Sequence, residues 1–429
     1  MTHSQNTYTR RSCLQAGLVG GLGLALSDNL KLQAEGKVQN ARADSVLFLN
    51  LAGGPSHLDT LDVKPEGPQE TRGEFQPIQS KIPGLVVCEH LPKFAGIADK
   101  FALIRGIHHS AGAHPQGQSY ISTGNRPTPA VIYPSLGSVI GKQRPTDPDL
   151  PPYIAVPNTE WNAGYLGDAF APFKTNTVPK PGEAFQVRGI SLPEGVTVEN
   201  VRRREQLLAK IDQTFRNVET NSPLLEALDT FSERAYEMIT SARAQSAFDV
   251  SKEPKSVQFR FTADELNQSL LLACRLLEFG VRFVTVTNAG WDTHLDNFKG
   301  HQRLLGPLDH GLKALYETLS SKGLLERTLV VVMGEFGRTP KINSNIGRDH
   351  WPRANWCLLT GAGVKNGLLL GGTDAEGAGA DDATDIEPDD IAATIYHALG
   401  IDPKTEFHTR TGRPVMLVPE GEVLEGVFA

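Results

Sequence analysis

Continuous apolar runs, each followed at once by polar and turn-forming residues, set the pattern of this chain. The runs at 46–52, 101–105, 281–287 and 329–333 are rich in valine, leucine and phenylalanine. Runs of this length and composition are typical of strands that are buried on both faces of a sheet. We therefore predict a central sheet whose strands end abruptly in polar loops.

Helical periodicity lies between the later strands. A capping-box pattern at 262–265 begins a helix that carries leucines at three- and four-residue spacing and ends at Gly280. A second helix is predicted over 301–322, between the strands at 281–287 and 329–333. Strand, helix and strand joined by short links are typical of a parallel sheet. The predicted fold class is α/β, with a mostly parallel central sheet flanked by helices.

Shorter elements complete the prediction. They are helices at 116–122 and 389–399 and a strand at 356–360. We predict a single domain over residues 44–425, with a loop-rich insertion near 125–195 and a helical excursion near 197–247. The prolines and scattered aromatic residues of 125–195 fit either a lid that shapes a substrate site or irregular packing.

The N-terminus has a different character. Arg10 and Arg11 precede a glycine-diluted apolar run at 16–26, a pattern typical of a twin-arginine export signal. We predict a signal peptide over 1–34, a periplasmic or extracytoplasmic location, and the twin-arginine translocation machinery as a partner during export. The alternative is a disordered basic terminus before a chance helix. The run is shorter than the roughly 20 residues that span a bilayer, so no stable transmembrane anchor is expected.

The net charge and the cysteine content argue against a nucleic-acid partner, a disulfide framework and a zinc ribbon. The formal net charge of −7 disfavours nucleic acid as a partner. Outside the predicted signal the cysteines are Cys88, Cys274 and Cys357, an odd number without CxxC spacing. Neither a disulfide framework nor a zinc ribbon is indicated.

Side chains suited to metal binding or proton transfer follow four of the predicted strands. They are His57 and Asp59, then His108, His109, Ser110 and His114, then Asp292 and His294, and finally Glu335, Asp349 and His350. Because the carboxyl ends of parallel strands meet at one edge, these groups are expected to converge. Histidine with carboxylate suits zinc, manganese or iron, and carboxylate alone suits calcium or magnesium. Each pair also has a purely structural interpretation as a helix cap or a loop hydrogen bond.

Several motifs carry a family resemblance. The paired arginines, GGPSHLDTLD at 53–62, GWDTHLDNF at 290–298, and GEFGRTP with GRDHW within 334–351 resemble the exported domain-of-unknown-function family 1501. That family has no assigned activity.

The order of elements is also similar, more distantly, to the alkaline phosphatase and sulfatase superfamily. This resemblance implies an alkaline-phosphatase-like fold and a metal site at Asp292, His294 and His350. Three departures from the superfamily pattern stand out. His114 falls where a nucleophile is expected, Phe336 replaces a metal-binding histidine of the second site, where Glu335 remains, and the first strand ends in Gly53 where an aspartate is expected, with Asp59 as a displaced substitute.

The resulting hypothesis is an exported metal-dependent hydrolase of phosphate or sulfate esters, acting on small molecules or on envelope or environmental polysaccharides. The cofactor would be a divalent ion, either zinc, calcium or manganese. The candidate ligands are Asp292, His294, His350, Asp349, Asp59 and His57. The candidate catalytic residues are Arg338 as anion binder, His114 as base for direct attack by water, Glu335 in support, and Ser110 as an outside nucleophile. The alternative is a catalytically silent exported binding or scaffold protein that retains the fold.

Overall fold

The structure, a computed structural model, describes residues 41–183, 185, 187–190, 197, 199–200, 203, 236–409 and 411–429. The predicted signal peptide at 1–34 and most of the predicted helical excursion at 197–247 lie outside the described residues.

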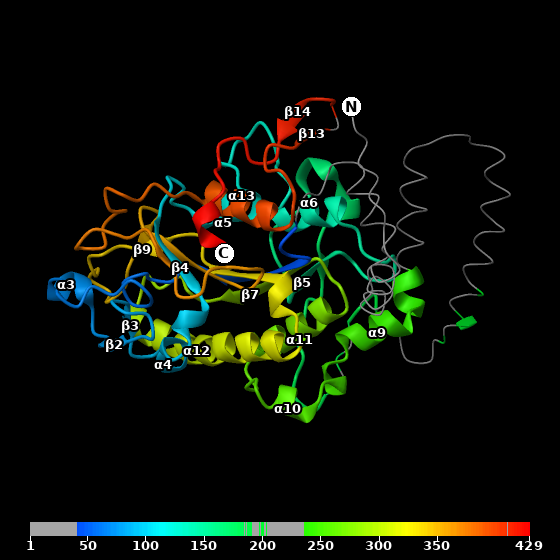
Figure 1. The fold of residues 1–429 in the computed structure, drawn as a ribbon, viewed down its shortest axis with the longest axis horizontal. Coiled ribbons are helices and arrows are strands. Elements are labelled where there is room, and N and C mark those ends of the chain that lie inside the picture. The colour runs from blue at the N-terminus through cyan, green and yellow to red at the C-terminus, as the bar shows by residue number, and fades with distance from the viewer. Residues whose placement is uncertain are drawn as a thin grey trace, which may run out of the picture.

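A central sheet of eight strands organises the chain, in the spatial order β12-β4-β11-β8-β1-β7-β5-β6 (Figure 1). The parallel pairs are β12 with β4, β8 with β1, β1 with β7, β7 with β5, and β5 with β6. Only β11 runs against its two neighbours within this sheet. The bounds are β1 Ser45–Ala52, β4 Ala102–Ile107, β5 Tyr153–Val156, β6 Phe173–Lys174, β7 Phe283–Ala289, β8 Thr328–Met333, β11 Asn355–Thr360 and β12 Leu369–Leu370.

The mostly parallel α/β class predicted from the sequence is confirmed. Strand β1 lies between β7 and β8, with Leu49 opposite both Val286 and Val332. This register brings the carboxyl ends of three central strands side by side. β4 runs in the same direction as β8, because both are antiparallel to β11. The loops after β1, β4, β7 and β8 therefore leave the same edge of the sheet.

Helices cover both faces of the sheet (Figure 1). The larger layer is formed by α11 (Glu265–Glu278) and α12 (Asn297–Ser321), which pack on each other and on one face. The opposite face carries α5 (His114–Thr123), α6 (Leu136–Gln143) and α13 (Pro388–Ala398). The other α-helices bounded within the described residues are α3 (Gln69–Arg72), α4 (Pro92–Ala95), α9 (Ala242–Phe248) and α10 (Lys255–Gln258).

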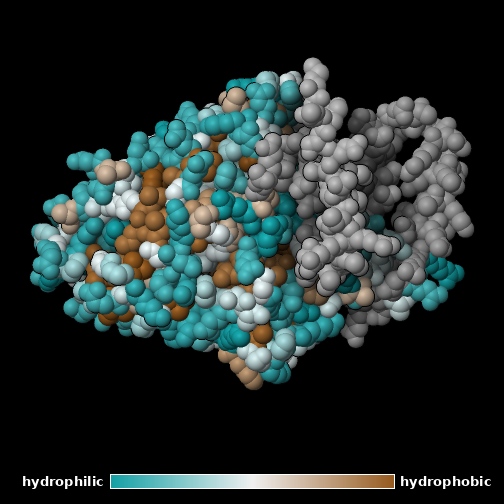
Figure 2. Space-filling model, viewed as in Figure 1, coloured by the Kyte–Doolittle hydropathy of each residue, from teal (hydrophilic) through white to brown (hydrophobic). Residues whose placement is uncertain are grey.

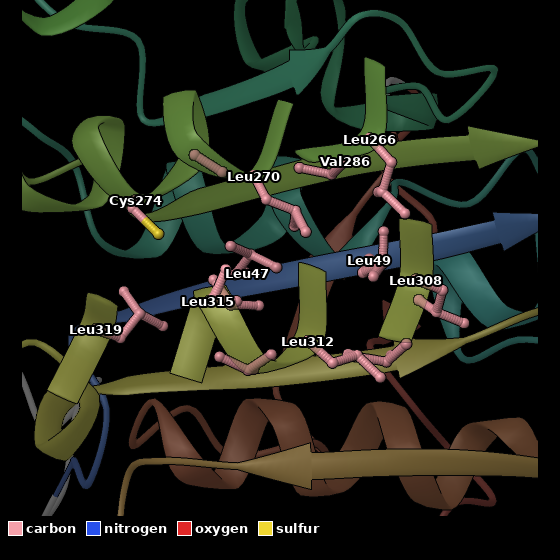
Figure 3. Close-up of a cluster of buried hydrophobic side chains, with 14 of the residues drawn as sticks. Leu47, Leu49, Leu266, Leu270, Cys274, Val286, Leu308, Leu312, Leu315 and Leu319 are labelled. Atoms are coloured by element: carbon pink, nitrogen blue, oxygen red, sulfur yellow. The ribbon is translucent and has the colours of Figure 1, made fainter. Parts of the chain in front are cut away.

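Strand β1 shows why a continuous apolar run was the right signal. Leu47 and Leu49 point into the core beneath α11 and α12, where Figure 3 shows them near Leu270, Leu312 and Leu315. The alternate residues, Val46 and Phe48, belong to the core on the other face. Because both faces are buried, apolar residues follow one another from Val46 to Leu49 instead of occupying every second position.

The stretch 125–195 contributes to the sheet as well as to loops. It supplies α6, β5 and β6, and β5 pairs with β7. Three small antiparallel pairs lie outside the main sheet: β2 (Pro77–Gln79) with β3 (Val86–Cys88), β9 (Gly337–Arg338) with β10 (His350–Trp351), and β13 (Glu406–His408) with β14 (Pro414–Met416).

The described surface on the face seen in Figure 2 is largely hydrophilic. Figure 2 shows hydrophobic residues in separate patches among hydrophilic ones on the face in view. Among the helices of the described ranges, none combines the length and the apolar character needed to cross a membrane.

Candidate functional site

Three loops meet at the carboxyl edge of the sheet, and glycine lets them approach closely. Gly53, directly after β1, has φ of 111°, and a Cβ added there would lie 2.5 Å from the backbone nitrogen of Asp292. Its own N–H donates to both carboxylate oxygens of Glu335, at 2.9 and 3.1 Å. The loop after β1 therefore joins the loops after β7 and β8 through backbone contacts.

Asp292, His294 and His350 form one cluster at this edge. The Nε2 atoms of His294 and His350 lie 2.9 Å apart, and they lie 3.1 and 3.3 Å from Asp292 Oδ1. Ligands bound about 2.0–2.1 Å from a zinc ion lie roughly 3.3 Å from one another in a tetrahedral shell. The three side chains thus have the mutual spacing of ligands to a single ion.

The outer nitrogens of the two rings are each held by an acceptor. His294 Nδ1 is 2.6 Å from Asp349 Oδ1, and His350 Nδ1 is 2.8 Å from the carbonyl oxygen of Gly112. The pairing of β10 with β9 places His350 opposite Arg338. Such outer partners fix the tautomer of a metal-binding histidine and leave Nε2 as the ligand atom.

These contacts make the cluster unfavourable without a cation. A ring that donates its Nδ1 proton carries a bare lone pair on Nε2 when it is neutral. Two such lone pairs then face each other across 2.9 Å, with the oxygen of Asp292 beside both. A divalent cation bound between the three atoms would remove this repulsion. The residues present therefore fit a metal ion.

His114 lies at the edge of the cluster, at the start of α5. Its Nε2 is 3.2 Å from Asp292 Oδ2 and is buried without a hydrogen bond, while its Nδ1 is 2.6 Å from Glu335 Oε1. The ligand atoms of His114, Asp292 and His350 all lie within 4.8 Å of one another. The hydrogen bond with Glu335 raises the pKa of His114.

Glu335 is fully buried and its carboxylate is saturated with donors. Besides His114 and Gly53, Gln118 donates to Glu335 Oε2 at 2.8 Å. Sequence reasoning missed Gln118, although its place four residues after His114 on a helix puts both on one face. His109, a candidate ligand, instead contacts the backbone oxygen of Glu335 through Nε2 at 2.7 Å.

Arg338 differs from its predicted role as an anion binder. The side chain is fully buried, and each of its three guanidinium nitrogens donates to an acceptor. Nε donates to the carbonyl of Gly54 at 2.9 Å, Nη1 to that of Arg348 at 3.1 Å, and Nη2 to Asp292 Oδ1 at 2.7 Å and to the carbonyl of Gly53. These contacts tie the three loops together, so Arg338 positions Asp292.

Asp59 and His57, two of the candidate ligands, make their contacts outside the cluster of Asp292, His294 and His350. Asp59 forms a fully buried ion pair with Arg348 that uses both carboxylate oxygens, at 2.7 and 3.1 Å. His57 Nε2 is 2.8 Å from the carbonyl of Gly377. Sequence reasoning missed Arg348, whose partner lies 289 residues away. Ser110 and Asp349 are exposed, and Asp349 acts through His294.

A family model described as "Protein of unknown function (DUF1501)" matches residues 43–428. The chain belongs to the DUF1501 family. No curated protein matches it.

Solved structures give matches at low identity. The lipoteichoic acid synthase LtaP from Listeria monocytogenes is 10% identical, with a TM-score of 0.38 over 90% of this chain and 78% of that chain. The PsFucS1 sulfatase from Pseudoalteromonas sp. is 13% identical, with a TM-score of 0.36 over 90% and 72%. A mutant of TAB5 alkaline phosphatase with magnesium bound is 11% identical, with a TM-score of 0.38 over 85% and 100%. Each of these is a similarity of fold to one solved structure at low sequence identity.

The charge states of Asp292 and His350 suit metal binding. Burial raises the pKa of Asp292, but the hydrogen bond and charge of Arg338 outweigh it and bring that pKa to about 2. Burial lowers the pKa of His350. Both shifts favour the deprotonated forms that bind metal.

The donor set narrows the choice of ion. Two imidazole nitrogens and one carboxylate oxygen, with a third imidazole alongside, suit zinc, manganese or iron. Calcium prefers six to eight oxygen ligands, so the predicted calcium option does not fit these residues.

The cluster of Asp292, His294 and His350 faces solvent. The exposed fractions are 45% for the side chain of Asp292, 42% for that of His294 and 23% for that of His350. A structural zinc site is closed by protein ligands, whereas a catalytic site keeps an open position. The exposure of this cluster fits the catalytic type.

Proposed function

We propose that this protein is a metal-dependent hydrolase of phosphate or sulfate esters. The observation that carries the proposal is the convergence of two imidazole Nε2 atoms on one oxygen of Asp292, on the solvent-facing edge of the sheet. The site combines ligands for one ion with the Nε2 of His114, which lies 3.2 Å from Asp292 Oδ2.

Asp292, His294 and His350 would hold the ion, with Asp349 orienting His294. A divalent metal at this position lowers the pKa of water and polarises an ester oxygen. Arg338 holds Asp292 at 2.7 Å and keeps it ionised. The three ligands are therefore held in place by protein contacts before any ion binds.

His114 is proposed as the group that takes a proton from the attacking water. Its Nε2 points into the cluster without a hydrogen bond, and Glu335 holds Nδ1 at 2.6 Å. A buried carboxylate in this position stabilises the imidazolium that forms when Nε2 accepts a proton. This arrangement needs no serine nucleophile, so Ser110 has no assigned step.

The ester class comes from the sequence resemblance to phosphatases and sulfatases. The negative charge of either ester group would face the bound cation and His114, since Arg338 has its nitrogens engaged within the protein. Small molecules and polysaccharides both remain candidate substrates.

The test begins with the metal content of the purified full chain, followed by assays against panels of phosphate and sulfate esters. We expect one ion per chain and turnover of at least one ester. Asp292→Ala and His350→Ala should lose both the ion and turnover. His408→Ala, at an exposed histidine on β13, is the control and should change neither.

His114→Gln separates the two roles open to this residue. As a proton acceptor, His114 can be replaced with metal content retained and turnover reduced by roughly 10²–10⁴-fold. Loss of the ion together with turnover would make His114 a ligand instead. The hydrolase proposal as a whole is overturned if the wild-type chain binds no ion and both ligand variants behave like wild type.

A catalytically silent binding protein is the second candidate. The engagement of Arg338 favours it, because no buried guanidinium is left over for an anion in this cluster. Stoichiometric metal without turnover on either panel would support this function over hydrolysis.

Export by the twin-arginine route is a further part of the proposal, and it rests on the pattern at Arg10 and Arg11. We expect the wild-type chain to reach the periplasm and the double variant Arg10→Lys and Arg11→Lys to stay in the cytoplasm. Cell fractionation with a cytoplasmic marker measures this. Unchanged export of the double variant would refute the route.

A further inference from the structure

A cavity of about 230 Å³ lies directly beside the candidate metal centre. One wall is the face of α5 that carries Pro115, Ser119 and Ser122, and the other side is formed by residues 127–128, 131–133 and 160–162. None of these residues is a candidate ligand. The cavity starts one residue after His114, so the helix presents one face to the metal centre and the adjacent face to the cavity.

The two spaces share the side chain of Gln118. Its amide nitrogen donates to Glu335 at 2.8 Å, on the side of the metal centre. Its amide oxygen accepts a hydrogen bond from Trp161 Nε1 at 3.1 Å, on the side of the cavity. A group that is bound in the cavity would therefore lie next to the residues that hold His114.

The lining of the cavity is part polar and part apolar, and it is almost uncharged. Ser119, Tyr133 and Asn162 line it, and the hydroxyls of the first two and the Asn162 Nδ2 make no hydrogen bond to the described part of the chain. No lysine or arginine lines the cavity, and its one charged residue is Glu160. This chemistry disfavours a second anionic group and offers donors and acceptors to neutral hydroxyls.

Size and shape restrict the occupant further. The cavity is smaller than the roughly 300–1,000 Å³ typical of pockets for drug-sized ligands, so it has room for one ring rather than an oligomer. Ile132, with 69% of its surface exposed, adds an apolar contact to the lining. A saccharide ring offers both hydroxyls and an apolar C–H face.

We propose that this cavity is a subsite for one saccharide ring of the substrate, next to the ester that is cleaved. The proposal rests on the hydrolase function, which it narrows to esters of carbohydrates. In this arrangement α5 holds His114 towards the ester and Ser119 towards the sugar, so that one rigid helix sets the distance between the two.

The first test compares two esters on the metal-loaded full chain. Glucose 6-phosphate or glucose 6-sulfate carries a ring, and ethyl phosphate or ethyl sulfate does not. Ser119→Leu places a bulky apolar side chain in the cavity and should lower the ratio of kcat/KM for the sugar ester to that for the ethyl ester at least tenfold. Ser320→Leu, at an exposed position of α12, is the matched control and should leave the ratio unchanged.

The second test measures binding without turnover. A panel of methyl glycosides is titrated against the full chain and followed by saturation-transfer NMR. We expect at least one glycoside to bind, and its affinity to fall at least fivefold in Ser119→Leu. Ile132→Ser, at an exposed residue, should weaken binding about threefold, and it keeps the test decisive if the first variant does not fold.

The outcomes separate the subsite from the hydrolase. Glycoside binding that Ser119→Leu removes, in a chain that turns over no ester, supports the subsite and overturns the hydrolase function. Ester turnover with an unchanged ratio in Ser119→Leu, and no binding of any methyl glycoside, overturns the subsite alone.

Discussion

Asp349→Asn tests whether the outer partner of a histidine helps to build the metal centre. Asp349 Oδ1 lies 2.6 Å from His294 Nδ1, and Asn343 Nδ2 lies 3.3 Å from the same oxygen. The substitution keeps the size of the side chain and an oxygen that can accept the proton, but it removes the charge. It leaves all three candidate ligand atoms in place.

The expected loss follows from the position of the carboxylate. Replacing the outer partner of a ligand histidine typically reduces metal affinity by about 10–100-fold. The Asp349 side chain is 54% exposed, so water screens its charge and can replace part of its hydrogen bond. We therefore expect the metal affinity of Asp349→Asn to fall by the lower limit of this range, about tenfold, which corresponds to about 1.4 kcal/mol of binding free energy.

Competition with a chelator of known affinity for zinc or manganese measures this change. Asp296→Asn is the matched control, because its carboxylate is 57% exposed, lies two residues from His294 and contacts Lys299 rather than an imidazole. The control removes the same charge from the same loop. It should change the metal affinity less than twofold.

Two results would refute the reasoning. Affinity within twofold of wild type in Asp349→Asn would show that the ring needs no carboxylate partner. An equal loss in both variants would show that the charge of the loop matters and the hydrogen bond does not. The metal-free form of Asp349→Asn should unfold within about 0.5 kcal/mol of wild type, as is usual for surface substitutions.

Three further predictions concern the supports of the site. Arg338→Met should lower the free energy of unfolding by about 3–5 kcal/mol in denaturant titration, because it leaves a buried network without its cation; an unchanged midpoint would contradict this. Gly347→Ala should abolish metal binding in the same chelator assay, since a Cβ there would lie 1.9 Å from the carbonyl oxygen of His294, whereas Gly426→Ala meets nothing within 4 Å and should bind normally. Burial lowers the pKa of His301 from 6.5 to about 4, so the unfolded chain binds a proton between these values that the folded chain does not. The contribution of His301 to the free energy of unfolding is therefore fully present above pH 6.5 and falls by about 3 kcal/mol as the pH drops to 4. His301→Gln should reduce this dependence of the unfolding free energy on pH, measured by urea titration. An unchanged pH dependence would show that other groups cause it.

The central sheet and part of the site could be predicted because they depend on local signals. β1 and β8 are mainly apolar runs and β7 is rich in valine and threonine, and the parallel rule brings their polar ends together without knowledge of distant contacts. Asp292, His294 and His350 meet for this reason. The reversed direction of β11 has no such signal, because an apolar strand of six residues reads the same in either direction.

The roles of the charged residues could not be read from the chain. Arg338 and Asp59 each follow a strand, as the ligands do. The partners of Arg338 include the backbone carbonyls of residues 53 and 54, and the partner of Asp59 is Arg348. Whether a charged side chain at a loop binds a ligand or satisfies buried groups depends on contacts hundreds of residues apart. Spacing along the chain carries no information about those contacts.

The glycines Gly53 and Gly347, in the motifs GGPSH and GRDHW, are explained by the same geometry. A Cβ at Gly53 would lie 2.5 Å from the backbone nitrogen of Asp292, and one at Gly347 would lie 1.9 Å from the carbonyl oxygen of His294. The motif GRDHW therefore serves two needs at once, a candidate ligand and the close approach of the loop that carries it, and GGPSH serves the close approach. A variant that keeps every ligand and loses one of these glycines should fail to bind the ion, which distinguishes a centre built by backbone packing from one built by its ligands alone.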